Sequence, residues 1–202
     1  MVMPELPEVE TVRRGLEGLI IGRTLASAVS DTPKSFPNAE ADVAQFLVGA
    51  TVLTVARRAK VLLIELDTKY SLVIHLKMTG QLVFVSPKER FGAGHPNASL
   101  IGQLPDKSTR VTLAFKDKSS LYFNDQRKFG WMRLMPTAEI VNLDFFKKVG
   151  PEPLSVDFSW QELYQRTQRR KNSNIKAVLL DQSVVAGIGN IYADESLWGA
   201  KI

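Results

Sequence analysis

Short apolar runs alternate with turn residues between positions 51 and 124, and this pattern limits the possible folds more than any other feature of the chain. The runs are rich in β-branched and aromatic residues, and each is bounded by Gly, Asp, Lys or Ser, as strands joined by hairpins are. Six strands at this spacing predict an antiparallel sandwich or barrel. The predicted strands cover residues 51–56, 61–66, 71–76, 81–85, 110–115 and 120–124.

A helical period flanks the β-rich region on both sides. Residues 7–21 place Val9, Val12 and Leu16 on one face of an amphipathic helix, opposite Arg13. The sequence therefore predicts an α+β protein with two parts. The first is an N-terminal β-rich domain, an antiparallel β-sandwich or barrel with flanking helices, over residues 1–136, and the second is a helical domain over residues 137–202. Helices are predicted at 138–148, 160–170 and 174–182, and an aperiodic, functional loop is predicted at 86–109.

Composition excludes several classes of protein. The chain has 202 residues, of which 45% are hydrophobic and 23% charged, as in ordinary globular proteins. No apolar run approaches the roughly 20 residues that span a bilayer, and the acidic, Pro-rich start is no signal peptide, so a cytoplasmic location is predicted. Zero cysteines exclude disulfides, thiol nucleophiles and thiolate-ligated metals, and two histidines argue against a His-rich metal site. A net charge of +5 favours a polyanionic partner.

The first ten residues place a proline, Pro4, directly before a carboxylate, Glu5. If Pro4 is the mature N-terminus, its amine has a pKa near 8, against about 10.4 for a lysine, so roughly 10% rather than 0.04% is free base at pH 7. As a secondary amine it would form an iminium that cannot lose a proton from nitrogen and so stays a cationic electron sink. The alternative interpretation is a Pro-rich helix cap.

Five segments in order resemble the formamidopyrimidine-DNA glycosylase family, and together they span nearly the whole chain. They are PELPEVE at 4–10, RRAK at 57–60, HLKMTG at 75–80, NDQRKFG at 124–130 and DQSVVAGIGNIYADESL at 181–197. The resemblance implies a bifunctional DNA glycosylase and abasic-site lyase of bacterial base excision repair. Such an enzyme excises 8-oxoguanine and formamidopyrimidines from damaged double-stranded DNA through a Schiff base on the N-terminal proline, followed by β,δ-elimination. It also implies a monomer that associates with the nucleoid.

The family resemblance assigns catalytic roles at the start of the chain and in the RRAK segment. Pro4 attacks C1′ of the damaged nucleotide, and Glu5 acts as general acid and base near the sugar ring oxygen. Lys60 contacts the phosphates and the damaged site. The alternative for Lys60 is a solvated lysine at the start of a strand.

The same resemblance assigns DNA-binding roles to six further residues. Met78 fills the gap left by the flipped base, Arg127 faces the orphaned base, and Phe129 wedges the stack. Because unstacking costs a few kcal/mol, the contacts of such wedges are needed to offset the free energy of flipping. The alternative for Met78 and Phe129 is packing in the core. The remaining three are His75, whose alternative is a satisfied strand histidine, Lys176, near the lesion pocket, and Asn190, a direct DNA contact.

The final segment resembles the helix–two-turns–helix of the family. The glycines at 187 and 189 permit close backbone approach, so amides at the following helix N-terminus are predicted to grip a phosphate.

Three features depart from the family pattern. Met1 and Val2 precede the expected Met3-Pro4 start, so initiation at Met3 followed by methionine removal is predicted. The chain stops before the family's four-cysteine zinc finger, so the helical domain is predicted to be incomplete and no cofactor is expected in this chain. Lys77 replaces the glycine of the usual HLGMSG form. Two alternative functions remain, a catalytically impaired DNA-binding remnant of the family and a basic α+β module of unrelated function.

Overall fold

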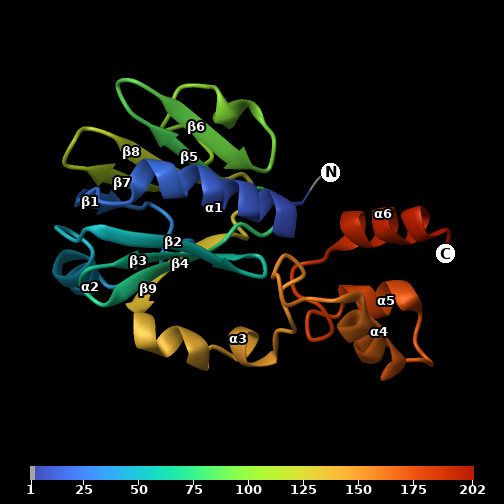
Figure 1. Cartoon of the computed structure of the whole chain (residues 1–202). Helices are drawn as coiled ribbons and strands as arrows, with labels where there is room; N and C mark the ends of the chain where they lie inside the picture. Colours follow the sequence, from blue (N-terminus) through green and yellow to red (C-terminus); the bar gives the residue numbers. More distant parts are fainter. Residues whose placement is uncertain (1–2) are drawn as a thin grey trace.

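The computed structural model describes residues 3–202, which form two antiparallel sheets and a helical region beside them (Figure 1). The five-stranded sheet has the order β1 (Leu25–Val29), β7 (Thr109–Phe115), β8 (Ser120–Asp125), β5 (Gly80–Val85), β6 (Arg90–Gly94). The four-stranded sheet has the order β2 (Val52–Arg58), β3 (Val61–Leu66), β4 (Tyr70–His75), β9 (Trp131–Pro136). The predicted α+β class with an antiparallel sandwich is therefore confirmed.

Three strands escaped the sequence prediction, namely β1, β6 and β9. Each lies at the edge of its sheet, where a strand pairs on one side only and needs less apolar patterning. The predicted loop at 86–109 is wrong in part, because β6 and the short helix η1 (Ala98–Leu100) lie within it. Two glycines in the RFGAG sequence of β6 hide its strand character. Pairing with β5 supplies the order instead, with Phe91 opposite Phe84.

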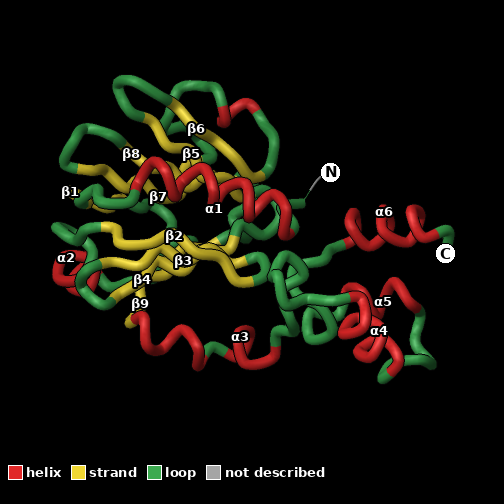
Figure 2. The backbone as a smooth tube through the Cα atoms, in the orientation of Figure 1, coloured by secondary structure: helices red, strands yellow, loops and turns green. Residues whose placement is uncertain are grey.

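Helix α1 (Leu6–Ile20) runs along the sandwich and closes one side of its core (Figures 1 and 2). Its apolar stripe of Val9, Val12 and Leu16 is fully buried with the inward-facing side chains of both sheets, as the period predicts. The short helix α2 (Glu40–Phe46), which buries no residue completely, was not predicted. The first residues of α1 lie at the end of the sandwich that faces the helical region (Figure 1).

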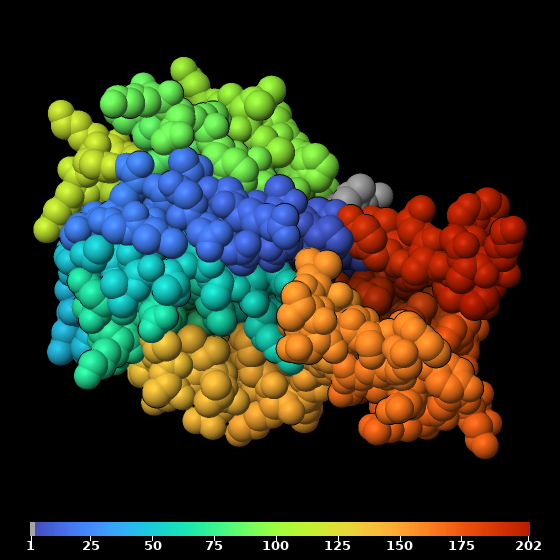
Figure 3. Space-filling view, in the orientation of Figure 1, coloured from blue at the N-terminus to red at the C-terminus, as the bar shows by residue number. Residues whose placement is uncertain are grey.

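The helical region follows β9. The predicted helix at 138–148 is interrupted and forms η2 (Thr137–Asn142) and α3 (Asp144–Lys148), which lie against the four-stranded sheet. The remaining helices are α4 (Trp160–Gln168), α5 (Ile175–Leu180) and α6 (Asn190–Ala200). Figure 3 shows this region packed against the end of the sandwich where α1 begins. None of the helices within residues 3–202 has the length and apolar character that crossing a bilayer requires.

Candidate active site

A cavity of about 460 Å³ lies where the sandwich meets the helical region. Five of the nine predicted site residues line it, and they come from four separate parts of the chain. They are Pro4, Lys60, His75, Met78 and Asn190. Residues spread over nearly the whole sequence thus meet at one hollow, as a catalytic site on a β-sandwich with an attached helical region requires.

Lys60 enters the cavity from the tight turn between β2 and β3. Ala59, just before it, adopts a left-handed conformation with φ of 52°, which turns the chain toward the cavity. The Lys60 ammonium donates a hydrogen bond of 3.1 Å to the carbonyl of Ile188. Burial lowers the pKa of Lys60, although the negative charges of Glu5 and Glu8 act in the opposite direction. Lys60 is therefore anchored to the turn before α6 and is not a freely solvated lysine.

His75 ends β4 and borders the cavity in its neutral form. Its Nδ1 accepts a hydrogen bond of 3.0 Å from the backbone N–H of Lys77. Burial, together with the nearby charges of Lys77 and Lys60, lowers the pKa of His75 to about 3. Because Nδ1 is the acceptor, the ring proton sits on Nε2, which is a donor at neutral pH.

This depressed pKa makes stability depend on pH. An unfolded histidine takes up a proton near pH 6.5, but the folded His75 does not until about pH 3, so acid favours the unfolded chain between these values. Between about pH 7.5 and pH 5 the protein should lose roughly 2 kcal/mol through this group. Urea unfolding at both pH values measures the loss, and His75→Asn should remove that part of it. An identical pH dependence in the variant would show that His75 titrates normally.

Glu5 lies beside the cavity, at the N-terminus of α6, and is 1% exposed. Its carboxylate accepts backbone hydrogen bonds from Gly189 at 2.7 Å, Ile191 at 3.0 Å and Tyr192 at 3.3 Å. The predicted phosphate grip by the amides of this helix end is therefore wrong for these three groups, because a side chain of the same protein already holds them. An anion at a helix N-terminus is stabilising, and here it is Glu5 that supplies the charge.

Glu8 extends the same connection. One of its oxygens accepts the backbone N–H of Glu5 at 2.8 Å, and the other accepts the hydroxyl of Tyr192 at 2.8 Å. Burial and the hydrogen bond to Glu8 raise the pKa of Tyr192 to about 12, so its hydroxyl keeps its proton and remains a donor. The start of α1 and the start of α6 are thus joined through two carboxylates.

A second set of ion pairs, which the sequence alone did not reveal, ties the sandwich to the helical region. Arg57, whose side chain is 6% exposed, contacts Glu10 of α1 at 2.9 Å and Glu152 of the following linker at 2.7 Å. Arg58 contacts Glu152 at 3.0 Å. Burial alone would raise the pKa of Glu10, but hydrogen bonds from Arg13, Arg57 and Arg14 outweigh it and lower the pKa to about 2. The two arginines of the RRAK segment therefore hold the two parts together.

Met78, Arg127 and Phe129 lie on two adjoining loops, β4–β5 and β8–β9. The loops are joined through Thr79, whose hydroxyl bonds to the buried carboxylate of Asp125 and accepts the Arg127 backbone N–H at 3.1 Å. The Arg127 guanidinium stands 5.0 Å from the Phe129 ring, which is 45% exposed. The core-packing alternative is therefore wrong for Phe129.

Two lysines near the site are placed differently from one another. Lys176 forms a salt bridge of 2.7 Å with Asp194 of α6 and is not part of the cavity lining, so its predicted DNA contact stays a prediction. Lys77 lines the cavity and has φ of 53°. A left-handed conformation suits glycine, the residue that the family resemblance leads one to expect at this position.

No metal site is formed in the part of the chain that the structure describes, since no three His, Cys, Asp or Glu side chains gather there. The sequence also has no cysteine with which to build the four-cysteine zinc site implied by the resemblance. The residues present thus do not fit that zinc ion.

Comparisons with known proteins show which family the chain resembles. The family model for the formamidopyrimidine-DNA glycosylase N-terminal domain matches residues 3–132, and the model for the formamidopyrimidine-DNA glycosylase H2TH domain matches residues 149–202. The formamidopyrimidine-DNA glycosylase of Herpetosiphon aurantiacus is 43% identical over 202 residues, covering 99% of this chain and 68% of that protein. The one from Chloroflexus aurantiacus is 42% identical over 99% of this chain and 66% of that protein.

Solved structures show the same likeness. Fpg of Lactococcus lactis, in complex with DNA that contains an abasic site, has a TM-score of 0.81 and 36% identity, over 98% of this chain and 68% of that one. MutM in complex with DNA containing carbocyclic 8-oxo-G has a TM-score of 0.80 and 36% identity, over 98% of this chain and 68% of that one. The chain thus spans about two thirds of the length of its relatives.

Proposed function

The chain belongs to the formamidopyrimidine-DNA glycosylase family, and from this premise we propose that it is a DNA glycosylase of base excision repair that removes damaged bases from duplex DNA. The observation that carries the proposal is the cavity that brings together Pro4, Lys60, His75, Met78 and Asn190. Relatives of the same fold bind DNA with an abasic site or 8-oxo-G, which supports the same substrate class for this chain.

The reaction that fits this cavity is glycosylase and lyase chemistry on oxidised purines, begun by the Pro4 amine. The free amine attacks C1′ of the damaged nucleotide, the bond from C1′ to the base breaks, and the base leaves with a proton. The C1′–O4′ bond then breaks, O4′ takes up a proton as the sugar ring opens, and nitrogen forms an iminium with C1′, which acidifies the hydrogen on C2′. Loss of that proton expels the 3′ phosphate, and a second elimination expels the 5′ phosphate. Proline suits this sequence because its iminium nitrogen has no proton to lose.

The other groups of the site assist in defined ways. The charge of Lys60, fixed beside Ile188, favours a nearby amine in its neutral form and attracts a phosphate. His75 offers an Nε2–H donor without adding charge, and Asn190 offers an exposed amide at the start of α6. Glu5 is proposed to assist proton transfer at the sugar ring. Both of its oxygens already accept backbone hydrogen bonds, so it acts as a fixed acceptor next to Pro4.

We propose that Met78, Arg127 and Phe129 hold the duplex open. If so, Met78→Ala and Phe129→Ala should lower excision of 8-oxoguanine from duplex DNA about tenfold or more, since a lost wedge leaves 1–3 kcal/mol of the unstacking cost uncompensated. Cleavage of a preformed abasic site should change less. Single-turnover rates on the two substrates measure the difference, and Arg127→Ala should also relax discrimination of the opposite base.

The control for this experiment is Val156→Ala, a fully exposed residue of the segment between α3 and α4, which should leave both rates unchanged. Equal loss of both activities in all three loop variants would mean that the loops maintain the fold and do not open the duplex.

A second candidate function is a DNA-binding protein of this family without catalysis. The observation that favours it is the Met3–Pro4 peptide bond, which makes the Pro4 nitrogen an amide without nucleophilicity wherever Met3 is retained. The two candidates differ in whether a covalent adduct with abasic DNA forms, which borohydride trapping detects.

A further inference from the structure

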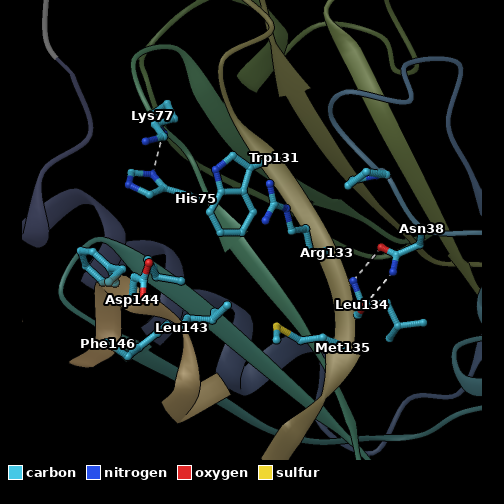
Figure 4. Close-up of a pocket in the computed structure, with 13 residues that line it drawn as sticks. Asn38, His75, Lys77, Trp131, Arg133, Leu134, Met135, Leu143, Asp144 and Phe146 are labelled. Atoms are coloured by element: carbon cyan, nitrogen blue, oxygen red, sulfur yellow. Dashed lines mark hydrogen bonds between the residues drawn. The ribbon is translucent and has the colours of Figure 1, made fainter. Parts of the chain in front are cut away.

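A larger cavity, of about 800 Å³, lies on the outer face of the four-stranded sheet, between β9 and the segment around α3 (Figure 4). It shares His75, Lys77 and Phe145 with the catalytic cavity, so the two hollows adjoin along the end of β4. The chemistry described above does not use this second cavity.

Aromatic rings form much of its wall. Trp131 packs, partly exposed, on an apolar cluster that includes Val61 and Val73. In Figure 4 it stands between His75 and Arg133, whose guanidinium lies 4.7 Å from the indole ring. Phe145 and Phe146 pack edge to face at 5.3 Å on the neighbouring segment. Arg133 lies over the Trp131 ring, and the rest of the partly exposed indole, together with the phenylalanines of α3, offers aromatic surface against which a flat group can stack.

The charges around these rings are mainly positive. Lys77 and Arg133 are exposed cations at the cavity, and His75 is neutral at physiological pH. Among the lining residues within positions 3–202, Asp144 is the one carboxylate. Two cations against one anion leave a positive rim around an aromatic floor. An apolar side chain of a protein partner would form no favourable interaction with that positive rim, whereas a phosphate would be attracted to it.

We propose that this second cavity binds an unpaired nucleotide of the same DNA strand that enters the catalytic cavity, with its base on Trp131 and its phosphate near Lys77 and Arg133. The inference rests on the proposed function, because it takes DNA as the ligand. Stacking on an aromatic ring beside a basic groove is how proteins hold single strands without reading their sequence. Flipping one nucleotide removes a stacking partner from its neighbour on the same strand, and this cavity would take that neighbour once it leaves its own base pair.

The test uses the full chain and a single-stranded oligonucleotide of about eight nucleotides, within the usual range of site sizes. It carries a stable abasic analogue with 2-aminopurine as the adjacent base, whose fluorescence falls on stacking. We expect quenching on binding. Trp131→Leu should abolish the quenching and raise Kd about 5- to 100-fold, the equivalent of one lost base stack. Arg133→Gln should raise Kd and reduce the salt dependence by about one ion.

Trp160→Leu is the matched control, since Trp160 is 73% exposed on α4 away from the cavity, and it should bind as the unchanged chain does. Trp131→Phe keeps a ring and should retain most of the quenching. If Trp131→Leu does not fold by circular dichroism, the Phe and Gln variants decide the matter. The inference is overturned if folded Trp131→Leu shows the same quenching and the same Kd as the unchanged chain, or if Trp160→Leu loses as much as Trp131→Leu does. It is also overturned if Arg133→Gln binds the oligonucleotide with an unchanged Kd and salt dependence.

Failure of this inference can be told from failure of the proposed function. Covalent trapping on abasic DNA depends on the Pro4 amine, whereas quenching of 2-aminopurine requires no chemistry. A chain that traps abasic DNA but shows no Trp131-dependent quenching refutes only the second cavity. A chain that quenches without trapping refutes the catalytic proposal and retains the nucleotide site.

Discussion

Protein whose chain begins at Pro4 is expected to form a borohydride-stable adduct with abasic duplex DNA, and protein that retains Met3 is expected to form none. With a terminal pKa near 8, roughly 10% of the Pro4 amine is free base at pH 7, whereas an amide nitrogen has no available lone pair. The difference should exceed a thousandfold. Borohydride trapping followed by mass mapping of the linked peptide measures both the yield and the residue attached.

Lys60 provides the control for this result, since it lines the same cavity and burial lowers its pKa. Lys60→Gln in the chain that begins at Pro4 should slow trapping through loss of charge but leave the adduct on Pro4. If protein with and without Met3 trapped DNA equally, or if the linked peptide contained residue 60, the nucleophile would be Lys60 and the assignment to Pro4 would be wrong.

Gly189→Ala should be strongly disruptive for a change of one methyl group. A Cβ at this position would stand 2.3 Å from the Glu5 carboxyl carbon, so the carboxylate must leave the backbone amides it accepts from. Hydrogen bonds to a charged group contribute about 1.5–3 kcal/mol, and the buried carboxylate would be left without partners. We expect the free energy of unfolding to fall by about 2–4 kcal/mol and adduct formation to fall with it, because the residue next to the nucleophile has moved.

Gly18→Ala is the matched control, because it lies within α1 and a Cβ there meets no atom within 4 Å. It should raise stability by about 0.5–1 kcal/mol through helix propensity. Thermal and urea unfolding of both variants gives the comparison. Wild-type stability and trapping in Gly189→Ala would show that Glu5 is not held as the structure has it.

Much of the fold followed from local patterns, and the rest depended on contacts that no pattern encodes. The strand at 61–66 and the helix at 7–21 were predicted to within one residue, because their side chains alternate or repeat against a core on one side. Strand β6 was missed because its order comes from pairing with β5. The division at 136/137 remains a prediction, although β9 does end at Pro136.

The candidate site shows the same division. The motif residues that line the cavity were identified from the sequence, since each lies in a short ordered segment of the family pattern. The partners of Glu5 were not, because the accepting carboxylate and the donating amide are 184 residues apart. Arg57 was overlooked for a similar reason, as its partner Glu152 lies in a linker without periodicity. Contacts with distant backbone amides or with carboxylates in a linker produce no local sequence pattern, so they cannot be predicted from one.

The bond between Glu5 and Gly189 has a consequence for accuracy. The proposed nucleophile Pro4 precedes Glu5, and Asn190, the proposed DNA contact, follows Gly189, so one hydrogen bond of 2.7 Å joins the two segments. Their relative position is therefore set by a direct contact and does not depend on small displacements in each of the nine strands and the loops between them. A misplacement of about 1 Å can lower the rate about a hundredfold. A direct connection between the proposed nucleophile and the proposed DNA contact therefore helps to keep the reacting groups in position. The sandwich can then change in sequence and in shape while the distance between the Pro4–Glu5 segment and the Gly189–Asn190 segment stays fixed.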